Sequence, residues 1–191
     1  MTARRIFLGA VIFAASCQVP ADLASQTVSS AASDGASDRV ADALVEADVA
    51  FANRETERLR QAIWTLDALG AQPRDEAGSM LLREWKASLP PGDIPTRGRT
   101  LGPAFLSGEV APNATIDFEQ TFLAGQRAEI AARTHGGTPI GLTVIDGRAK
   151  TLCASSGNRI RCRWTPPYTQ RHLIRIDNPR SATVKYFISF I

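Results

Sequence analysis

The 191-residue chain has few of the side chains on which most enzyme and metal sites depend. It contains two histidines and three cysteines. No H-E-x-x-H, C-x-x-C or P-loop pattern occurs. His135-Gly136-Gly137 is similar to the oxyanion turn of some lipases, but no G-x-S-x-G elbow accompanies it. We therefore expect the Gly pair to form a turn and His172 to be structural, and the sequence predicts a protein that is not an enzyme and has no metal or cofactor.

Long apolar runs are also scarce, and the clearest one is at the N-terminus. Residues 6–15 are apolar and follow Arg4 and Arg5. This length is typical of a secretory signal and is too short to span a bilayer. Small residues at 19–21 predict cleavage before Asp22. The sequence therefore predicts export to the periplasm or beyond, and no second apolar stretch reaches membrane-spanning length.

An alternative concerns Cys17, which follows Ala14, Ala15 and Ser16. This pattern is similar to a lipobox, in which Cys17 would be lipidated and the mature protein anchored to a membrane. Bacterial lipoproteins usually carry Leu, Val or Ile where this chain has Ala14, which favours cleavage before Asp22. Both alternatives place the mature protein in the cell envelope or outside it.

The charges are unevenly distributed along the mature chain. Residues 22–90 contain 12 acidic and 7 basic residues, a balance of −5, whereas residues 91–191 contain 7 acidic and 13 basic residues, a balance of +6. Surfaces of opposite sign can meet each other or different partners.

The first half of the mature chain has a helical pattern. Residues 22–37 are rich in Ser and Ala and predict a flexible tether. Apolar residues recur at helical spacing over 38–70, with Gly70 as the stop, and a second helix is predicted over 74–88. We expect a helical hairpin over 38–89, followed by a Pro- and Gly-rich linker over 90–103.

After the linker the apolar period becomes two, which predicts β-structure over 104–191. Short strands at this spacing, with no helix between them, indicate a mainly β protein with a sandwich or jelly roll of about eight strands. The predicted strands cover 105–110, 115–123, 127–134, 140–146, 150–154, 159–165, 171–177 and 183–191.

The β region resembles the bacterial pre-peptidase C-terminal domain. The resemblance rests on the Gly turn in "FLAGQRAEIAA", the strand in "PIGLTVIDG", the "RWTPP" element, the "IRIDN" strand and the closing "VKYFISFI" strand. It implies a β-sandwich accessory domain and identifies no ligand. Many family members have acidic residues where this chain has Pro139 and Gly141, so the resemblance does not imply a calcium site here.

Cys153 and Cys162 are predicted to form a disulfide. If Gly157-Asn158 is a two-residue hairpin turn, Cys153 lies directly opposite Cys162 in a non-hydrogen-bonded pair, where side chains approach most closely. Disulfides persist in exported proteins. Free thiols or half of a metal site are the weaker alternatives, because no His or third mature Cys lies nearby in the sequence.

The strand that carries Cys162 also predicts a basic surface. Strict alternation sends Ile160, Cys162 and Trp164 toward the core and Arg159, Arg161 and Arg163 to the other face. We call these three arginines the arginine ladder. Arg171 and Arg175 are predicted to extend it from the next strand. Three alternatives remain open for these five residues: a site for an anionic partner, a solvated face, or a docking surface for the acidic helices.

The sequence thus favours a non-catalytic envelope protein whose sandwich binds an anionic polymer or a protein. A self-assembling structural protein is the main alternative, with the basic sheet of one copy meeting the acidic helices of another. A small hydrolase is the third. Nucleic acid is not an expected partner, because the compartment is wrong and no binding motif occurs.

Overall fold

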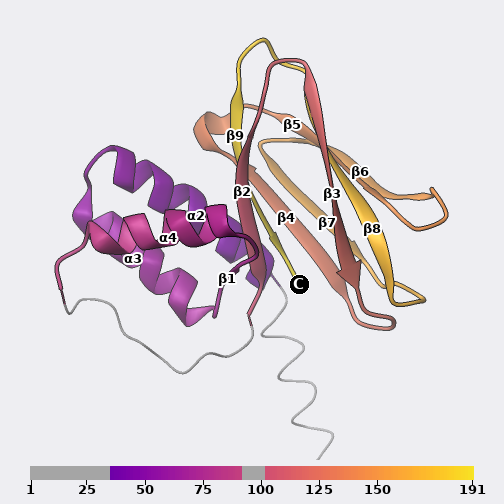
Figure 1. The fold of residues 1–191 in the computed structure, drawn as a ribbon, viewed down its shortest axis with the longest axis horizontal. Coiled ribbons are helices and arrows are strands. Elements are labelled where there is room, and N and C mark those ends of the chain that lie inside the picture. The colour runs from indigo at the N-terminus through magenta and orange to yellow at the C-terminus, as the bar shows by residue number, and fades with distance from the viewer. Residues whose placement is uncertain (1–34, 92–101) are drawn as a thin grey trace, which may run out of the picture. The chain divides into compact units, whose positions relative to one another are not determined.

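The computed structural model describes residues 35–91 and 102–191. Within them, three helices precede a two-sheet β-sandwich (Figure 1). The helices are α2 (Ala36–Ala52), α3 (Thr56–Ala68) and α4 (Glu76–Ala87). The predicted signal peptide, Cys17, the tether up to residue 34 and most of the predicted linker lie outside the described residues.

The sandwich confirms the predicted mainly β fold class. Sheet A has the strand order β1-β2-β9-β4-β7 and sheet B has the order β3-β8-β5-β6. Eight strands build the two layers, and the two-residue strand β1 adds to β2 in parallel. Their bounds are β1 Gln72–Pro73, β2 Ala104–Val110, β3 Ala114–Phe122, β4 Ala128–Thr134, β5 Ile140–Ile145, β6 Thr151–Gly157, β7 Arg159–Trp164, β8 Gln170–Asn178 and β9 Val184–Phe190.

Alternation along the strands builds the sandwich core. On β8, Ile174 and Ile176 are fully buried while Arg171 is exposed. The same rule places Ile160 and Cys162 of β7 in the core. Trp164 was predicted to join them, and it packs against the edge of this core while remaining half-buried.

The helical region departs from the sequence prediction in one respect. A single helix was predicted over 38–70, but the chain turns back at Asn53 and Arg54, so that α2 and α3 lie side by side. Arg54 has a φ of 58°, a left-handed conformation that helices do not contain. The hairpin was predicted between helices over 38–70 and 74–88, whereas α2 and α3 form it, and α4 is a third helix.

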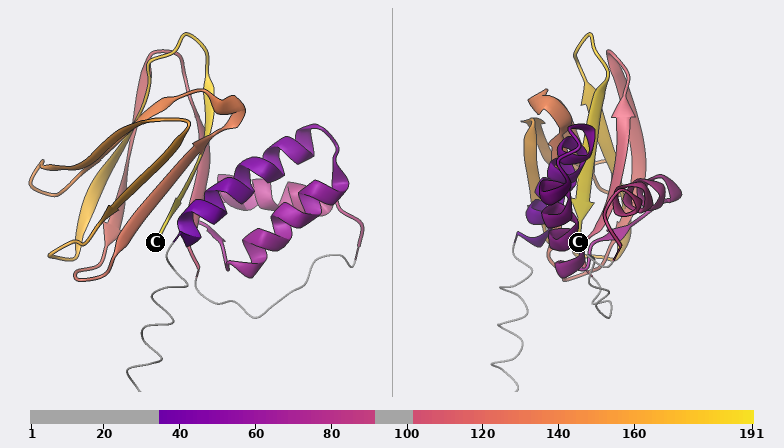
Figure 2. Two further views of the ribbon diagram at one scale, coloured as in Figure 1. Left: turned by 180° about the vertical axis from the view of Figure 1, so that it is seen from behind. Right: turned by 90° about the vertical axis from the view of Figure 1, so that its left-hand side faces the viewer.

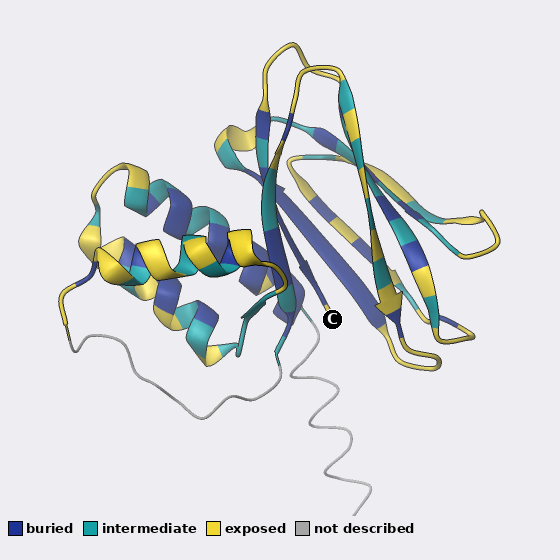
Figure 3. Ribbon diagram, viewed as in Figure 1, coloured by how far each residue is buried: buried dark blue, intermediate teal, exposed yellow. Residues whose placement is uncertain are grey.

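The helices cover the outer face of sheet A over β2, β4 and β9 (Figure 2). Phe105 of β2 and Phe187 of β9 point out of the sandwich into a second apolar core with Val40, Leu44 and Trp85, and all five are fully buried. Strand β4 lies between the two cores, which explains why every one of its residues is buried (Figure 3). The described chain is thus a three-layer structure of helices, sheet A and sheet B.

The disulfide is confirmed, but its predicted position within a hairpin is wrong. Cys153 and Cys162 are bonded, with their Cα atoms 6.0 Å apart. However, β6 pairs with β5 in sheet B and β7 pairs with β4 in sheet A. Gly157, which has a φ of 151°, and Asn158 therefore carry the chain from one sheet to the other. The disulfide links the edges of the two sheets.

Candidate binding surfaces

The arginine ladder meets carboxylates of the same chain. Arg159 bonds Asp42 of α2 at 2.8 Å, and Arg161 pairs with Asp38 of the same helix. Arg163 bonds Glu129 of β4 at 2.5 Å. Of the three alternatives, docking of the acidic helices is the one that the structure displays.

Arg133 of β4, which the sequence reasoning overlooked, lies at the centre of this surface. Its side chain is 5% exposed, and its guanidinium bonds Asp38 and Asp42, each at 2.6 Å. Its Nη1 also donates to the backbone carbonyls of Ala132 at 2.9 Å and Ile160 at 3.2 Å. A buried charge with this many partners is satisfied, so Arg133 fixes α2 on sheet A.

A second group of charges fixes the other end of α2. Asp48, almost fully buried, accepts a bond from Lys185 of β9 at 2.7 Å and lies 2.8 Å from His135. The acids that hold α2 thus come from one helix, their cations come from β4, β7 and β9, and His135 lies beside Asp48 in the turn after β4. Asp38, Asp42 and Asp48 of the acidic half of the chain thus pair with cations of its basic half. The self-assembling alternative predicted from the sequence depends on charges of these same two halves.

Arg171 and Arg175 do not extend the arginine ladder, because β8 belongs to sheet B. Arg175 forms a bidentate pair with Asp117 of β3 at 2.8 and 2.9 Å, and this hydrogen bonding lowers the pKa of Asp117. Arg171 bonds Glu119 at 3.2 Å. Each of the five predicted site arginines therefore meets a carboxylate of this chain, and an anion from outside would have to compete with it.

His172 is a core residue, as the sequence predicted. It is fully buried, lies edge-on to Phe122, and its Nε2 accepts a hydrogen bond from Trp164 Nε1 at 3.3 Å. Its Nδ1 faces the carbonyl of Gln170 at 3.2 Å. Burial lowers the pKa of His172 below its ordinary value of 6.5, so the ring is neutral and holds this aromatic cluster together.

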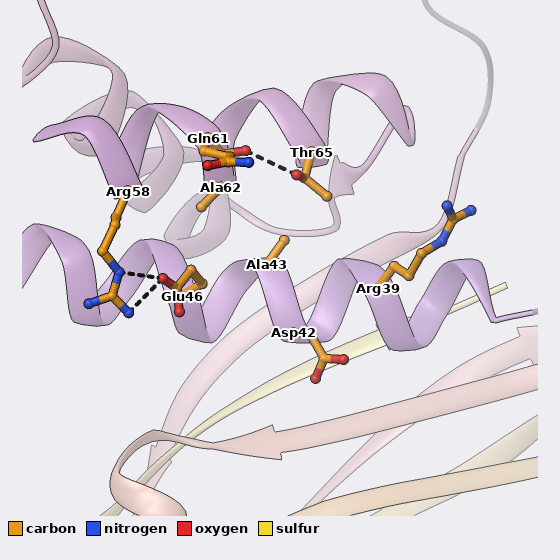
Figure 4. Close-up of a pocket in the computed structure, with 8 residues that line it drawn as sticks. All are labelled: Arg39, Asp42, Ala43, Glu46, Arg58, Gln61, Ala62 and Thr65. Carbon is orange, nitrogen blue, oxygen red and sulfur yellow. Dashed lines mark hydrogen bonds and ion pairs between the residues drawn. The ribbon is translucent and has the colours of Figure 1, made fainter. Parts of the chain in front are cut away.

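A groove of about 400 Å³ lies between α2 and α3 (Figure 4). Ala43 and Ala62 line it between the two helices, and Glu46 bonds Arg58 across it at 2.7 Å. Asp42 points away from the groove toward the sheet. The acids at this groove are thus engaged by cations of the same chain, and its walls favour no particular ligand.

The strongest surface feature lies at one end of the sandwich. It is formed by the turns at 123–127, 146–150 and 165–169 and by Ile191, which follows β9. We call it the loop end. Three of the five large apolar side chains that are exposed within the described residues belong to it: Leu123 is 50% exposed, Tyr168 58% and Ile191 41%. Leu123 and Ile191 also line one hollow, together with polar residues that include Gln126 and Arg127.

Hydrogen bonds brace two of these turns against each other, and further bonds fix the third turn internally. Gly125 N–H donates to the carbonyl of Pro166 at 2.9 Å, and Ala124 N–H donates to Thr169 Oγ1 at 3.0 Å. In the third turn, Asp146 accepts from the backbone N–H groups of Lys150 and Arg148, each at 2.9 Å. The bond from Lys150 is the main reason why the pKa of Asp146 is lowered. The exposed side chains therefore stand on a fixed backbone.

Cations surround the exposed apolar side chains of the loop end. The Arg148 guanidinium lies 5.6 Å from the centre of the Tyr168 ring, within the range of a cation–π contact. Arg127 and Lys150 are exposed in the neighbouring turns. Asp146 is the one acidic residue in the three turns, and part of its carboxylate is taken up by the backbone. The loop end thus combines apolar anchors with a net positive charge.

Among residues 35–91 and 102–191, no three His, Cys, Asp or Glu side chains come together in a way that would hold a metal ion. The described helices also include none with the length and apolar character needed to cross a bilayer.

No protein-family model matches the chain, and no curated protein is similar to it in sequence. Solved structures do resemble the β region. The pre-peptidase C-terminal domain of a collagenase from Bacillus anthracis is 10% identical, with a TM-score of 0.41 over 46% of this chain and 87% of that one. The pre-peptidase C-terminal domain is also the family that the β region resembles in sequence.

Two further structures are similar at the same level. The periplasmic inhibitor of g-type lysozyme from Aeromonas hydrophila, PliG, is 17% identical, with a TM-score of 0.37 over 46% of this chain and 83% of that one. The Yersinia pseudotuberculosis-derived mitogen is 15% identical, with a TM-score of 0.36 over 47% and 84%. The likeness is one of fold.

Proposed function

We propose that this chain is an exported, non-catalytic binding module that recognises an acidic partner through the loop end of its sandwich. The observation that supports the proposal most is the pair of exposed apolar side chains Leu123 and Tyr168, which stand on turns braced against each other, with Ile191 beside Leu123 at the same hollow. Exposed apolar side chains grouped on one surface are typical of interaction sites, whereas single scattered ones are not.

The composition of the loop end suits a protein-binding site. Tyr and Arg are enriched among the residues that dominate binding energy, and Tyr168 with Arg148 supplies this combination. Because the turns are already braced, little conformational entropy is lost when a partner binds. The positive charge of the same surface favours an acidic partner and accelerates its approach.

The arginine ladder has a structural role under this proposal and is not the binding site. Its charges hold the helical layer on sheet A, and the helices cover that sheet. The helices pack on β2, β4 and β9 of sheet A, while the outward residues of β7 and of β3 in sheet B remain accessible. Binding is therefore assigned to the uncovered side of the molecule and to the loop end.

The experiment is affinity capture from envelope extracts with the purified mature protein, followed by titration of each captured protein after purification. The double variant Leu123→Ser, Tyr168→Ala should lose the partner, with affinity reduced about a hundredfold, because two exposed anchors are removed. The matched control is Met80→Ser, which removes an apolar side chain that is 58% exposed on α4. Equal binding by the double variant and the wild type would refute the proposal.

A further inference from the structure

Strand β3 is an edge of sheet B, since it pairs with β8 on one side. Two hydrogen bonds show which of its backbone groups face away from β8. The carbonyl of Glu119 accepts from Arg74 Nη2, and the carbonyl of Thr121 accepts from Gln120 Nε2 at 3.0 Å. Both acceptors therefore point off the free edge of the sheet.

The N–H groups of Glu119 and Thr121 point the same way. In an antiparallel strand, the N–H and C=O of one residue lie on the same side, and the direction alternates along the chain. Phe118 and Gln120, which precede Glu119 and Thr121, thus direct their own N–H and C=O groups toward β8. The free edge of β3 presents alternating donors and acceptors with the spacing that an added strand requires.

Arg74 lies against this edge from the other sheet. It follows β1, and its backbone N–H donates to the carbonyl of Phe105 at 2.8 Å, which fixes it to sheet A. Its guanidinium lies 5.3 Å from the ring centre of Phe118 and 5.5 Å from that of Phe190. Arg74 is nevertheless exposed, so a ligand can reach it.

Open space adjoins the edge. A hollow of about 520 Å³ is lined by Arg74, Glu119, Gln120, Thr121 and Arg171. It meets the hollow of about 240 Å³ at the loop end, because Gln120 and Thr121 line both. Volumes of this size are typical of ligand sites. We call the two together the β3 groove.

We infer that the β3 groove binds an extended acidic segment of a partner protein, which adds to sheet B as a strand alongside β3. Strand addition requires a ligand with a peptide backbone, which favours a polypeptide over a polysaccharide or a lipid. The charged residues that line the groove are Arg74, Arg127, Arg171 and Glu119. Three cations against one acid select a ligand with carboxylates. This inference rests on the proposed function and names the form of the partner.

The existing contacts define how the segment enters. Its N–H groups replace Arg74 and Gln120 as donors to the carbonyls of Glu119 and Thr121. The released Arg74 guanidinium then pairs with an acidic side chain of the ligand, and a second ligand carboxylate competes with Glu119 for Arg171. An aliphatic side chain of the same segment packs beside Leu123 and Ile191 in the hollow at the loop end.

The test uses fluorescent ten-residue peptides in which Glu alternates with Val or Leu, measured by anisotropy against the full mature protein. A peptide with Lys in place of Glu is the charge control. N-methylation of one set of alternate residues should abolish binding, because it removes the N–H groups that face β3. N-methylation of the other set should leave binding intact, because those groups face solvent.

Protein variants test the arginines. Arg74→Gln with Arg171→Gln should weaken binding of the acidic peptide about tenfold, since two charge-assisted bonds are lost. Arg39→Gln with Arg180→Gln, two exposed arginines outside both the groove and the loop end, should leave it unchanged. In NMR spectra, the amides of Glu119 and Thr121 should become protected from exchange when the peptide binds.

Three results would overturn the inference. They are equal binding of the acidic and Lys peptides, indifference to N-methylation of either set, and failure of the peptides to bind. If no peptide binds but the protein still captures a partner that depends on Leu123 and Tyr168, the proposed function would stand with a different partner chemistry. A concentration-dependent dimer that disappears in the Arg74, Arg171 variant would identify a second copy of the chain as the occupant instead.

Discussion

Arg133 illustrates at the scale of one residue how this molecule uses its charges. Its side chain is 5% exposed, and the side chain of Asp38 opposite it is 9% exposed. Removing one member of such a pair leaves an uncompensated charge in a poorly solvated place. The network therefore contributes to stability only while it is complete.

Arg133→Met should destabilise the protein by about 3–5 kcal/mol, the cost of leaving a buried partner charge unpaired. The measurement is urea unfolding followed by circular dichroism. Arg159→Gln is the matched control, because Arg159 is 62% exposed and bonds the same Asp42; it should cost less than about 1 kcal/mol. Similar losses from both variants would show that Arg133 is not the centre of the network.

His172 should make stability depend on pH at values below about 6.5. Burial lowers its pKa below 6.5 in the folded state, so the unfolded chain takes up a proton more readily as the pH falls. The stabilisation is complete above pH 6.5 and is lost as the pH falls toward the folded pKa. His172→Phe keeps the ring packing and should flatten the profile of unfolding free energy in this window. An unchanged slope in the variant would exclude His172 as its origin.

The residue scale also shows what alternation predicts and what it leaves open. It placed Arg159, Arg161 and Arg163 on one face and Ile160 on the other, and the structure agrees. It could not say what covers the arginine face, because that depends on contacts between residues more than 100 positions apart. One signal was available: Asp38 and Asp42 are four residues apart, which places both on one side of a helix.

At the scale of elements, the disulfide joins two sheets. Its loop is short, with a sequence separation of 9, and should contribute about 2–3 kcal/mol. Cys153→Ser with Cys162→Ser should lose this amount in urea unfolding. Because the bond ties the edges of β6 and β7, amides of these two strands should exchange faster in the variant, while those of β3 and β8 keep their protection. Uniform acceleration over all strands would contradict this placement.

The sequence predicted the strands better than the connections between them. Each predicted strand agrees with an observed one to within a few residues, since period-two alternation is strong over 104–191. The Gly157-Asn158 pair was read as a hairpin turn, but turn chemistry alone does not decide whether two flanking strands pair or diverge into different sheets. The turn at Asn53 and Arg54 was missed because Arg is an ordinary helix residue and the apolar spacing continues through it.

At the scale of the whole molecule, the two oppositely charged halves form one structure. Replacing Arg159, Arg161 and Arg163 by Gln was expected from the sequence to leave stability almost unchanged. The structure corrects this expectation, since Arg161 meets buried Asp38 and Arg163 meets buried Glu129. The triple variant should lose about 2–4 kcal/mol of unfolding free energy, measured by urea unfolding. Under conditions in which the variant is folded, its affinity for the partner should equal that of the wild type.

The most direct test of the whole account is site-specific photo-crosslinking in the native envelope. A photoreactive residue at position 168 should link to a separate protein, because Tyr168 stands on the surface assigned to the partner. The same residue at position 159 should link to helix α2 of its own chain, where Asp42 now bonds Arg159. A separate protein captured from position 159, with none captured from position 168, would contradict the account.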